Sequence, residues 1–135
     1  MVQEILDKIR DRKATIGIVG LGYVGLPLAA EFIKAGFKVL GFDIDAEKIR
    51  MLKAAKSYIK HIPSEKLKEM NGTGRFNATS DFSKSSGCDA VIICVPTPLT
   101  HHREPDMTYI VSTGEALAPY VRRGQLFSLE STTYP

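Results

Sequence analysis

Apolar runs and segments with helical spacing alternate along this chain of 135 residues. The run from Thr15 to Val19 is almost entirely apolar and stops at a glycine, and the longer run from Ala90 to Val95 stops at Pro96. Runs without polar alternation are typical of parallel strands that helices cover on both faces of a sheet. Three further strands are predicted at residues 37–42, 75–79 and 126–130.

One helix is predicted before these strands and four between them. Apolar residues from Val2 to Ile9 recur at i, i+3, i+4 and i+7, which indicates an amphipathic N-terminal helix over residues 2–12. Asp45 and Asp106 can serve as the N-caps of two later helices. The alternation predicts an α/β fold, a doubly wound parallel sheet whose first strand is central and which stops after its fifth strand. The four later helices are predicted at residues 23–35, 45–55, 64–70 and 106–118.

A glycine motif, Gly20-Leu21-Gly22-Tyr23-Val24-Gly25, follows the first predicted strand directly and opens a helix. In this context a G-x-G-x-x-G sequence is typical of the Rossmann dinucleotide-binding fold. Gly20 allows the tight turn, Gly22 lets a pyrophosphate approach the backbone, and Gly25 lets the helix pack close to the strand. The free N–H groups of the first helical turn can then bind the phosphates. A tight turn without a ligand is the alternative.

Asp43 ends the second predicted strand. A carboxylate at this position can accept hydrogen bonds from both hydroxyls of an adenosine ribose, and it repels the 2′-phosphate of NADP. Two unit charges at about 4 Å repel by roughly 4 kcal/mol near a protein surface, so NAD is the predicted cofactor. Lys48 can offset part of this charge, whereas Asp45 is better explained as a helix N-cap.

Hydroxyl groups follow the fourth and fifth predicted strands, as Thr97 and as Ser131-Thr132-Thr133. Because the carboxyl ends of parallel strands meet at one edge of the sheet, these hydroxyls are expected to contact the same ligand. His101 and His102 lie in a polar loop, where exposure to solvent is the simpler interpretation and a substrate or metal role is the alternative. No carboxylate or cysteine stands at metal-ligand spacing from them, so no metal site is predicted.

Composition and charge exclude several classes of protein. Lys and Arg number 18 and Asp and Glu 15, a net charge of +3 that is scattered along the chain, so no nucleic-acid partner is predicted. The two cysteines, Cys88 and Cys94, are interpreted as reduced packing residues. The N-terminus does not resemble a signal peptide and no apolar run is long enough to span a bilayer. We therefore expect a cytoplasmic protein without a membrane partner.

Four sequence blocks resemble the N-terminal, NAD-binding domain of the UDP-glucose/GDP-mannose dehydrogenase family. They are Ile16–Pro27 (IGIVGLGYVGLP), Gly41–Asp45 (GFDID), Ile93–Leu99 (ICVPTPL) and Glu130–Pro135 (ESTTYP), and they follow the family's order over nearly the whole chain. His102–Asp106 (HREPD) is most similar to the branch that oxidises UDP-N-acetylglucosamine to the uronic acid in the synthesis of bacterial surface polysaccharides. UDP-glucose and UDP-N-acetylmannosamine are the alternative substrates.

The resemblance implies an NAD-dependent, four-electron oxidation of the primary alcohol of the sugar. It implies that the glycine loop holds the pyrophosphate, and that Asp43 and Lys48 hold the adenosine ribose. Thr97 and Thr132 are implied on the nicotinamide side, and Thr133 is implied as the catalytic residue that orients the attacking water or the substrate. The cofactor-binding residues that the resemblance implies are Gly20, Gly22, Tyr23, Val24, Gly25, Asp43, Lys48, Thr97 and Thr132.

The family's nucleophilic cysteine, catalytic lysine and nucleotide-sugar pocket lie far downstream, outside residues 1–135. Cys88 and Cys94 stand in no comparable setting. We therefore expect residues 1–135 to be the NAD-binding domain, inactive by itself, of a homo-oligomeric oxidoreductase that takes a UDP-sugar. Two other classes stay open: a nucleotide-binding module without turnover, and another Rossmann protein such as a methyltransferase, which the tight glycine loop disfavours.

Overall fold

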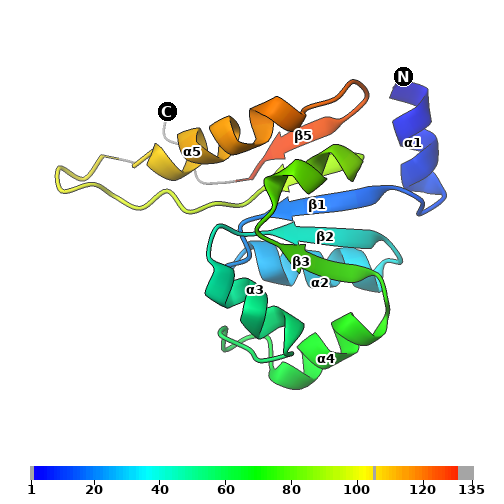
Figure 1. Ribbon diagram of the computed structural model, residues 1–135, viewed down its shortest axis with the longest axis horizontal. Helices are drawn as coiled ribbons and strands as arrows, with labels where there is room; N and C mark the ends of the chain where they lie inside the picture. Colours follow the sequence, from blue (N-terminus) through cyan, green and yellow to red (C-terminus); the bar gives the residue numbers. More distant parts are fainter. Residues whose placement is uncertain (1, 105, 131–135) are drawn as a thin grey trace.

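The computed structural model describes residues 2–104 and 106–130. At its centre lies a five-stranded, all-parallel sheet with the strand order β3-β2-β1-β4-β5 (Figure 1). The strands are β1 (Thr15–Val19), β2 (Lys38–Phe42), β3 (Phe76–Thr79), β4 (Ala90–Ile93) and β5 (Leu126–Leu129). The α-helices are α1 (Val2–Arg10), α2 (Gly25–Lys34), α3 (Ala46–Lys53), α4 (Ser64–Gly72) and α5 (Thr108–Leu117), and the 3₁₀ helices are η1 (Phe82–Gly87) and η2 (Ala118–Tyr120).

Successive residues of a strand point to opposite sides of the sheet. Other side chains pack on both sides. On one face Ile16 and Ile18 of β1 pack with the buried side chains of α2, α3 and α4. On the other face Val19 of β1 packs with Phe42 of β2 and Leu117 of α5. The predicted doubly wound α/β fold is therefore confirmed, with β1 between β2 and β4. No helix within the described ranges is long and apolar enough to cross a membrane.

Several element boundaries differ from the predictions. α1 ends two residues early, because Arg12 adopts a positive φ of 61° and reverses the chain. α2 and α5 each begin two residues later than predicted, after a turn. β4 stops at Ile93, because this residue pairs with the last residue of β1. η1 forms where no element is predicted, and the Asp81 carboxylate caps it by accepting a hydrogen bond from the Ser83 N–H.

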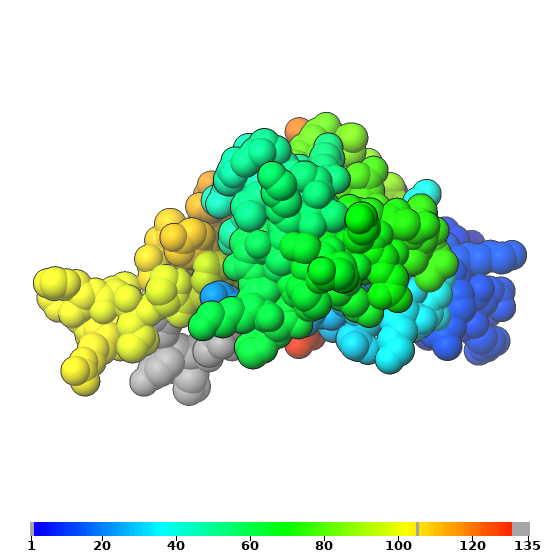
Figure 2. Space-filling model, turned by 90° about the horizontal axis from the view of Figure 1, so that it is seen from below, coloured from blue at the N-terminus to red at the C-terminus, as the bar shows by residue number. Residues whose placement is uncertain are grey.

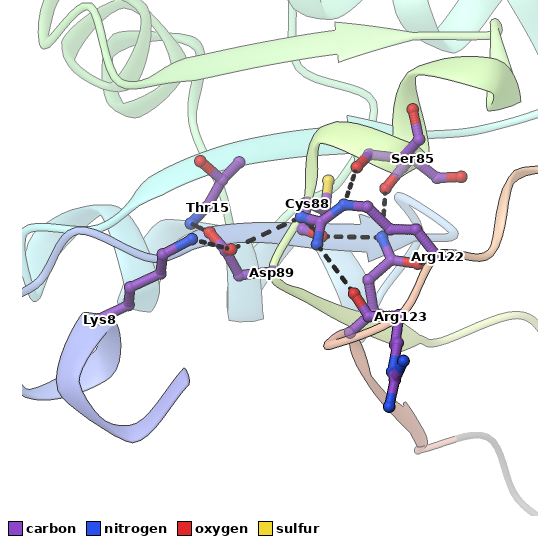
Figure 3. A network of polar contacts seen from close by, with 9 residues as sticks. Lys8, Thr15, Ser85, Cys88, Asp89, Arg122 and Arg123 are labelled. Atoms are coloured by element: carbon purple, nitrogen blue, oxygen red, sulfur yellow. Dashed lines mark hydrogen bonds and ion pairs between the residues drawn. The ribbon is translucent and has the colours of Figure 1, made fainter. Parts of the chain in front are cut away.

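A polar cluster around Asp89 joins four parts of the chain (Figure 3). The Asp89 side chain lies just before β4 and accepts hydrogen bonds from the Thr15 backbone N–H at 2.8 Å and from Lys8 Nζ of α1 at 2.9 Å. Arg122, which precedes β5, lies 3.6 Å from the same carboxylate and donates to the Cys88 carbonyl at 3.1 Å. This group of residues, the Asp89 cluster, holds α1 and the start of β5 against the amino ends of β1 and β4.

β5 is expected to mediate self-association of the 135-residue chain. It forms one edge of the sheet, and its Leu126, Phe127 and Leu129 are exposed. Such an edge offers unpaired N–H and C=O groups to a second strand. Light scattering should show an average mass that rises above the monomer mass with concentration, and Leu129→Lys should suppress the rise. A strict monomer at high concentration, or equal suppression by Leu6→Lys on the equally exposed face of α1, would contradict this expectation.

Candidate functional site

The carboxyl ends of β1, β2 and β4 open into one cleft of about 570 Å³, which α5 and the residue after β5 also border. The predicted cofactor residues that line this cleft are Gly20, Gly22, Tyr23, Val24, Asp43, Lys48 and Thr97. Gly25 is buried behind the glycine loop. Thr132 and Thr133 lie outside the described residues. The fold thus brings together residues from three separate strand ends, as expected from the parallel sheet.

The three glycines of the motif have different surroundings. Gly20 has a φ of +94°, a left-handed conformation that glycine adopts without strain. A Cβ on Gly25 would lie 1.7 Å from the Gly20 carbonyl oxygen, so only glycine lets α2 start this close to β1. A Cβ on Gly22 would meet no atom within 4 Å. Gly20 and Gly25 are therefore needed for the loop itself, whereas Gly22 leaves space beside the backbone.

Free backbone donors gather next to that space. Among the described residues, no acceptor contacts the N–H groups of Gly22, Tyr23 and Val24. Helical hydrogen bonding begins one turn later, where the Leu26 N–H donates to the Gly22 carbonyl at 3.1 Å. Free N–H groups at the start of a helix carry the positive end of its dipole and bind anions such as phosphate. The loop is therefore suited to hold a diphosphate.

Asp43 has a structural role that the sequence analysis missed. Its side chain is buried, with 8% of the residue exposed, and its Oδ2 accepts a hydrogen bond from the Leu21 N–H at 2.9 Å. Its Oδ1 accepts a second bond from the Asp45 N–H at 2.9 Å. The carboxylate thus ties the glycine loop to the end of β2, and each of its oxygens keeps a lone pair for a ligand. Asp45 caps α3 as predicted, by accepting from the Glu47 N–H at 3.0 Å.

Residues beyond the predicted set also line the cleft. One face of α5 contributes Tyr109, Ser112, Thr113 and Ala116. These positions follow the i, i+3, i+4, i+7 spacing, so a helical projection of residues 108–117 would have shown that they share a face. The sequence does not indicate that this face turns toward the cleft, because the rotation of α5 depends on the packing of Leu117 against Val19, Phe42 and Val91 of the sheet.

The two cysteines remain protonated thiols near neutral pH. Burial, together with the negative charge of Asp89, raises the pKa of Cys88 to about 11, although Arg122 opposes the shift. Burial and then Glu130 raise the pKa of Cys94, which borders the cleft. Because the thiolate is the nucleophilic form, neither residue is activated. Cys88 packs with Val19, Phe42 and Leu117 on one face of the sheet, as predicted.

His101 and His102 stand away from the cleft. Both are exposed in the loop that follows β4, and this loop projects from one end of the molecule, opposite α1 (Figure 2). Neither histidine lines the cleft. Among the residues that the structure describes, no group of three or more His, Cys, Asp or Glu side chains could hold a metal ion. The exposed position of both histidines agrees with the interpretation that they belong to a solvated loop.

A central parallel strand, a glycine loop with free N–H groups and a carboxylate at the next strand end define a dinucleotide-binding domain of the Rossmann type. The comparison with known families agrees. The sequence model of the UDP-glucose/GDP-mannose dehydrogenase family, NAD binding domain, matches residues 14–135. The chain belongs to this family of oxidoreductases, and NAD is the cofactor of the matching domain.

Relatives with known names support the same family. The chain is 38% identical over 120 residues to a UDP-N-acetyl-D-glucosamine 6-dehydrogenase of Salmonella typhi, and 34% identical over 119 residues to a UDP-N-acetyl-D-mannosamine dehydrogenase of Yersinia pestis. These alignments cover 89% and 88% of this chain but 27% and 28% of the relatives. A GDP-mannose dehydrogenase from Pseudomonas aeruginosa, solved as a ternary complex, superposes with a TM-score of 0.82 at 32% identity, over 89% of this chain and 29% of that one. The chain thus spans less than a third of each relative's length.

Proposed function

We propose that residues 1–135 are the NAD-binding domain of a nucleotide-sugar 6-dehydrogenase that oxidises UDP-N-acetylglucosamine to the uronic acid in surface-polysaccharide synthesis. The observation that carries the proposal is the row of free N–H groups at Gly22, Tyr23 and Val24 beside an open space, next to the buried Asp43. The relative from Salmonella typhi supports this substrate, and the mannosamine relatives make UDP-N-acetylmannosamine the main competitor.

The cleft residues fit NAD in chemical type. The free N–H groups bind its diphosphate, and the remaining lone pairs of Asp43 accept hydrogen bonds from the adenosine ribose. Ile44, 73% exposed at the rim of the cleft, offers an apolar surface to the adenine ring. Lys48 lies beside the ribose position, and Thr97 borders the cleft at the end of β4. Bound NAD would accept the hydride from the sugar alcohol.

Further parts of the proposal concern residues outside the described ranges and the longer protein. Thr132 is assigned to the nicotinamide side and Thr133 to the orientation of the attacking water or the substrate. The nucleotide-sugar site and the nucleophilic cysteine belong to further domains, and the assembled enzyme is a homo-oligomer. The length of the relatives, of which this chain covers about 27–30%, supports further domains.

NAD should bind at least about tenfold more tightly than NADP, because Asp43 repels a 2′-phosphate. Asp43→Asn removes that charge and keeps one acceptor oxygen, so the ratio of the two dissociation constants should fall below about threefold. Calorimetry on the 135-residue chain measures both constants. Asp11→Asn makes the same chemical change in the exposed turn after α1, outside the cleft, and should leave the ratio unchanged. Equal affinities in the unaltered chain would contradict the ribose assignment.

The substrate is tested on the full-length protein. NADH formation is measured with UDP-N-acetylglucosamine, UDP-N-acetylmannosamine and UDP-glucose in turn. We expect the highest kcat/KM with UDP-N-acetylglucosamine. A higher value with another of the three sugars would correct the substrate, and activity with none would overturn the enzyme assignment.

A further inference from the structure

Tyr58 lies in a tightly held turn between α3 and α4, next to the glycine loop. The turn is closed by a bridge between Ile59 and Ile62, both 5% exposed. Within it the Ser57 hydroxyl donates to the Ile59 carbonyl at 2.8 Å, and the Ser57 N–H donates to Ser64 Oγ at 3.1 Å. The backbone on both sides of Tyr58 is therefore anchored, and its side chain is half-buried rather than free in solvent.

The Tyr58 hydroxyl donates a hydrogen bond to the Leu21 carbonyl at 2.6 Å, across 37 residues of sequence. On the other side of the same residue, the Leu21 N–H donates to Asp43 at 2.9 Å. Burial, followed by the charges of Asp43 and Asp45, raises the pKa of Tyr58 well above its ordinary value, so the phenol stays a donor at any physiological pH. Leu21 is thus held at both of its backbone polar groups.

We propose that Tyr58 is a positioning residue of the cofactor site, which directs the Gly22 N–H toward the diphosphate by holding the Leu21 carbonyl. This step rests on NAD binding at the glycine loop. In a trans peptide the C=O and N–H groups point in opposite directions. The Leu21 carbonyl points to Tyr58, which does not line the cleft, so the N–H of Gly22 in the same peptide points to the opposite side.

The ring of Tyr58 has a second role beside the same cleft. Lys48 Nζ lies 5.7 Å from the ring centroid, within the range of a cation–π contact. Lys48 lines the cleft, and the turn that carries Tyr58 does not. The ring therefore contacts the Lys48 ammonium group on the side away from the proposed ribose position. The hydroxyl and the ring act on different partners, so two substitutions separate them.

The hydroxyl is tested with Tyr58→Phe, which keeps the ring. NMR titrations compare ADP-ribose, which carries the diphosphate, with adenosine, which does not. We expect the dissociation constant of ADP-ribose to rise about five- to tenfold and that of adenosine to change less than about twofold. Tyr120→Phe removes a hydroxyl from η2, outside the cleft, and should change neither constant. Equal weakening of both ligands, or no weakening, would overturn the hydroxyl's role.

A second measurement needs no ligand. In the free protein, Tyr58→Phe should shift the carbonyl resonance of Leu21 and the amide resonance of Gly22, while the amides of α4 keep their protection. Unmoved resonances at both residues would refute the inference, whatever the protein binds. If the unaltered chain binds neither NAD nor ADP-ribose, the proposed function fails, and this spectrum still decides the role of Tyr58.

The ring is tested with Tyr58→Leu. We expect it to weaken NAD binding about threefold more than Tyr58→Phe does, because the cation–π contact is also lost. In a Lys48→Met background the two Tyr58 variants should bind NAD equally. A difference that persists without the lysine would show that the ring acts only through packing.

Discussion

Gly22→Ala should weaken NAD binding by at least about tenfold and leave the fold of the chain intact. A Cβ at this position meets no protein atom within 4 Å, and the backbone has no positive φ that would strain an alanine. The added methyl group instead occupies the space beside the free N–H groups, which is the proposed site of the diphosphate. Calorimetry with NAD measures the affinity, and thermal unfolding followed by circular dichroism measures the stability.

Gly25→Ala is the matched variant from the same motif. We expect it to lower the stability of the fold, which Gly22→Ala should leave intact. Its Cβ would lie 1.7 Å from the Gly20 carbonyl oxygen, so β1 and α2 must separate. The free energy of unfolding should fall by about 3 kcal/mol or more. Similar melting temperatures for the two variants would contradict the view that one glycine serves the ligand and the other the fold. NAD binding that survives Gly22→Ala unchanged would contradict the diphosphate assignment.

Asp89→Asn should lower the free energy of unfolding by about 2–3 kcal/mol at neutral pH. Asp89 is 8% exposed, and its carboxylate accepts hydrogen bonds from the Thr15 N–H and from Lys8 Nζ. Loss of its charge weakens both bonds and leaves Arg122 without its ion pair. Urea unfolding measures the change, and Asp11→Asn, on the exposed turn after α1, is the control that should cost less than about 0.5 kcal/mol.

The contribution of Asp89 should disappear in acid. Burial by itself would raise the pKa of this carboxyl, but the hydrogen bonds from Thr15 and Lys8 and the charge of Arg122 outweigh burial, and the pKa is lower than usual. A lowered native pKa means that the stabilisation is complete above the unfolded value of about 3.9 and is lost as the pH falls through the native value. The difference between the unaltered chain and Asp89→Asn should therefore shrink below about pH 4. A constant difference down to the acid transition would contradict the ion-pair account.

The strands and the glycine loop are predictable because their determinants are local. A strand buried on both faces needs a run of apolar residues, and the turn at Gly20 needs a residue that accepts a φ of +94°. The N-cap at Asp45 likewise depends on an N–H two residues away. Each of these features is complete within a few neighbouring positions, so the sequence pattern carries it.

The second role of Asp43 could not be predicted from local sequence patterns. Its position at a strand end predicts a ribose contact, but its bond to the Leu21 N–H joins residues 22 apart in the sequence. The Tyr58 hydroxyl reaches its acceptor across 37 residues, and Asp89 reaches Thr15 across 74. No short pattern marks these pairs, because one partner in each is a backbone N–H or C=O group, which no side chain in the sequence identifies.

The amino-acid sequence alone determined the parallel α/β fold, the central first strand and the place of the glycine loop at its carboxyl end. It also determined which residue types could meet a dinucleotide there. Only the tertiary structure decided how those residues are held: Tyr58 and Asp43 on either side of Leu21, one face of α5 on the cleft, and the Asp89 cluster at the amino ends of β1 and β4. Local patterns depend on backbone geometry over a few residues, whereas partners distant in sequence meet only when the packed sheet and helices bring their side chains within hydrogen-bonding distance.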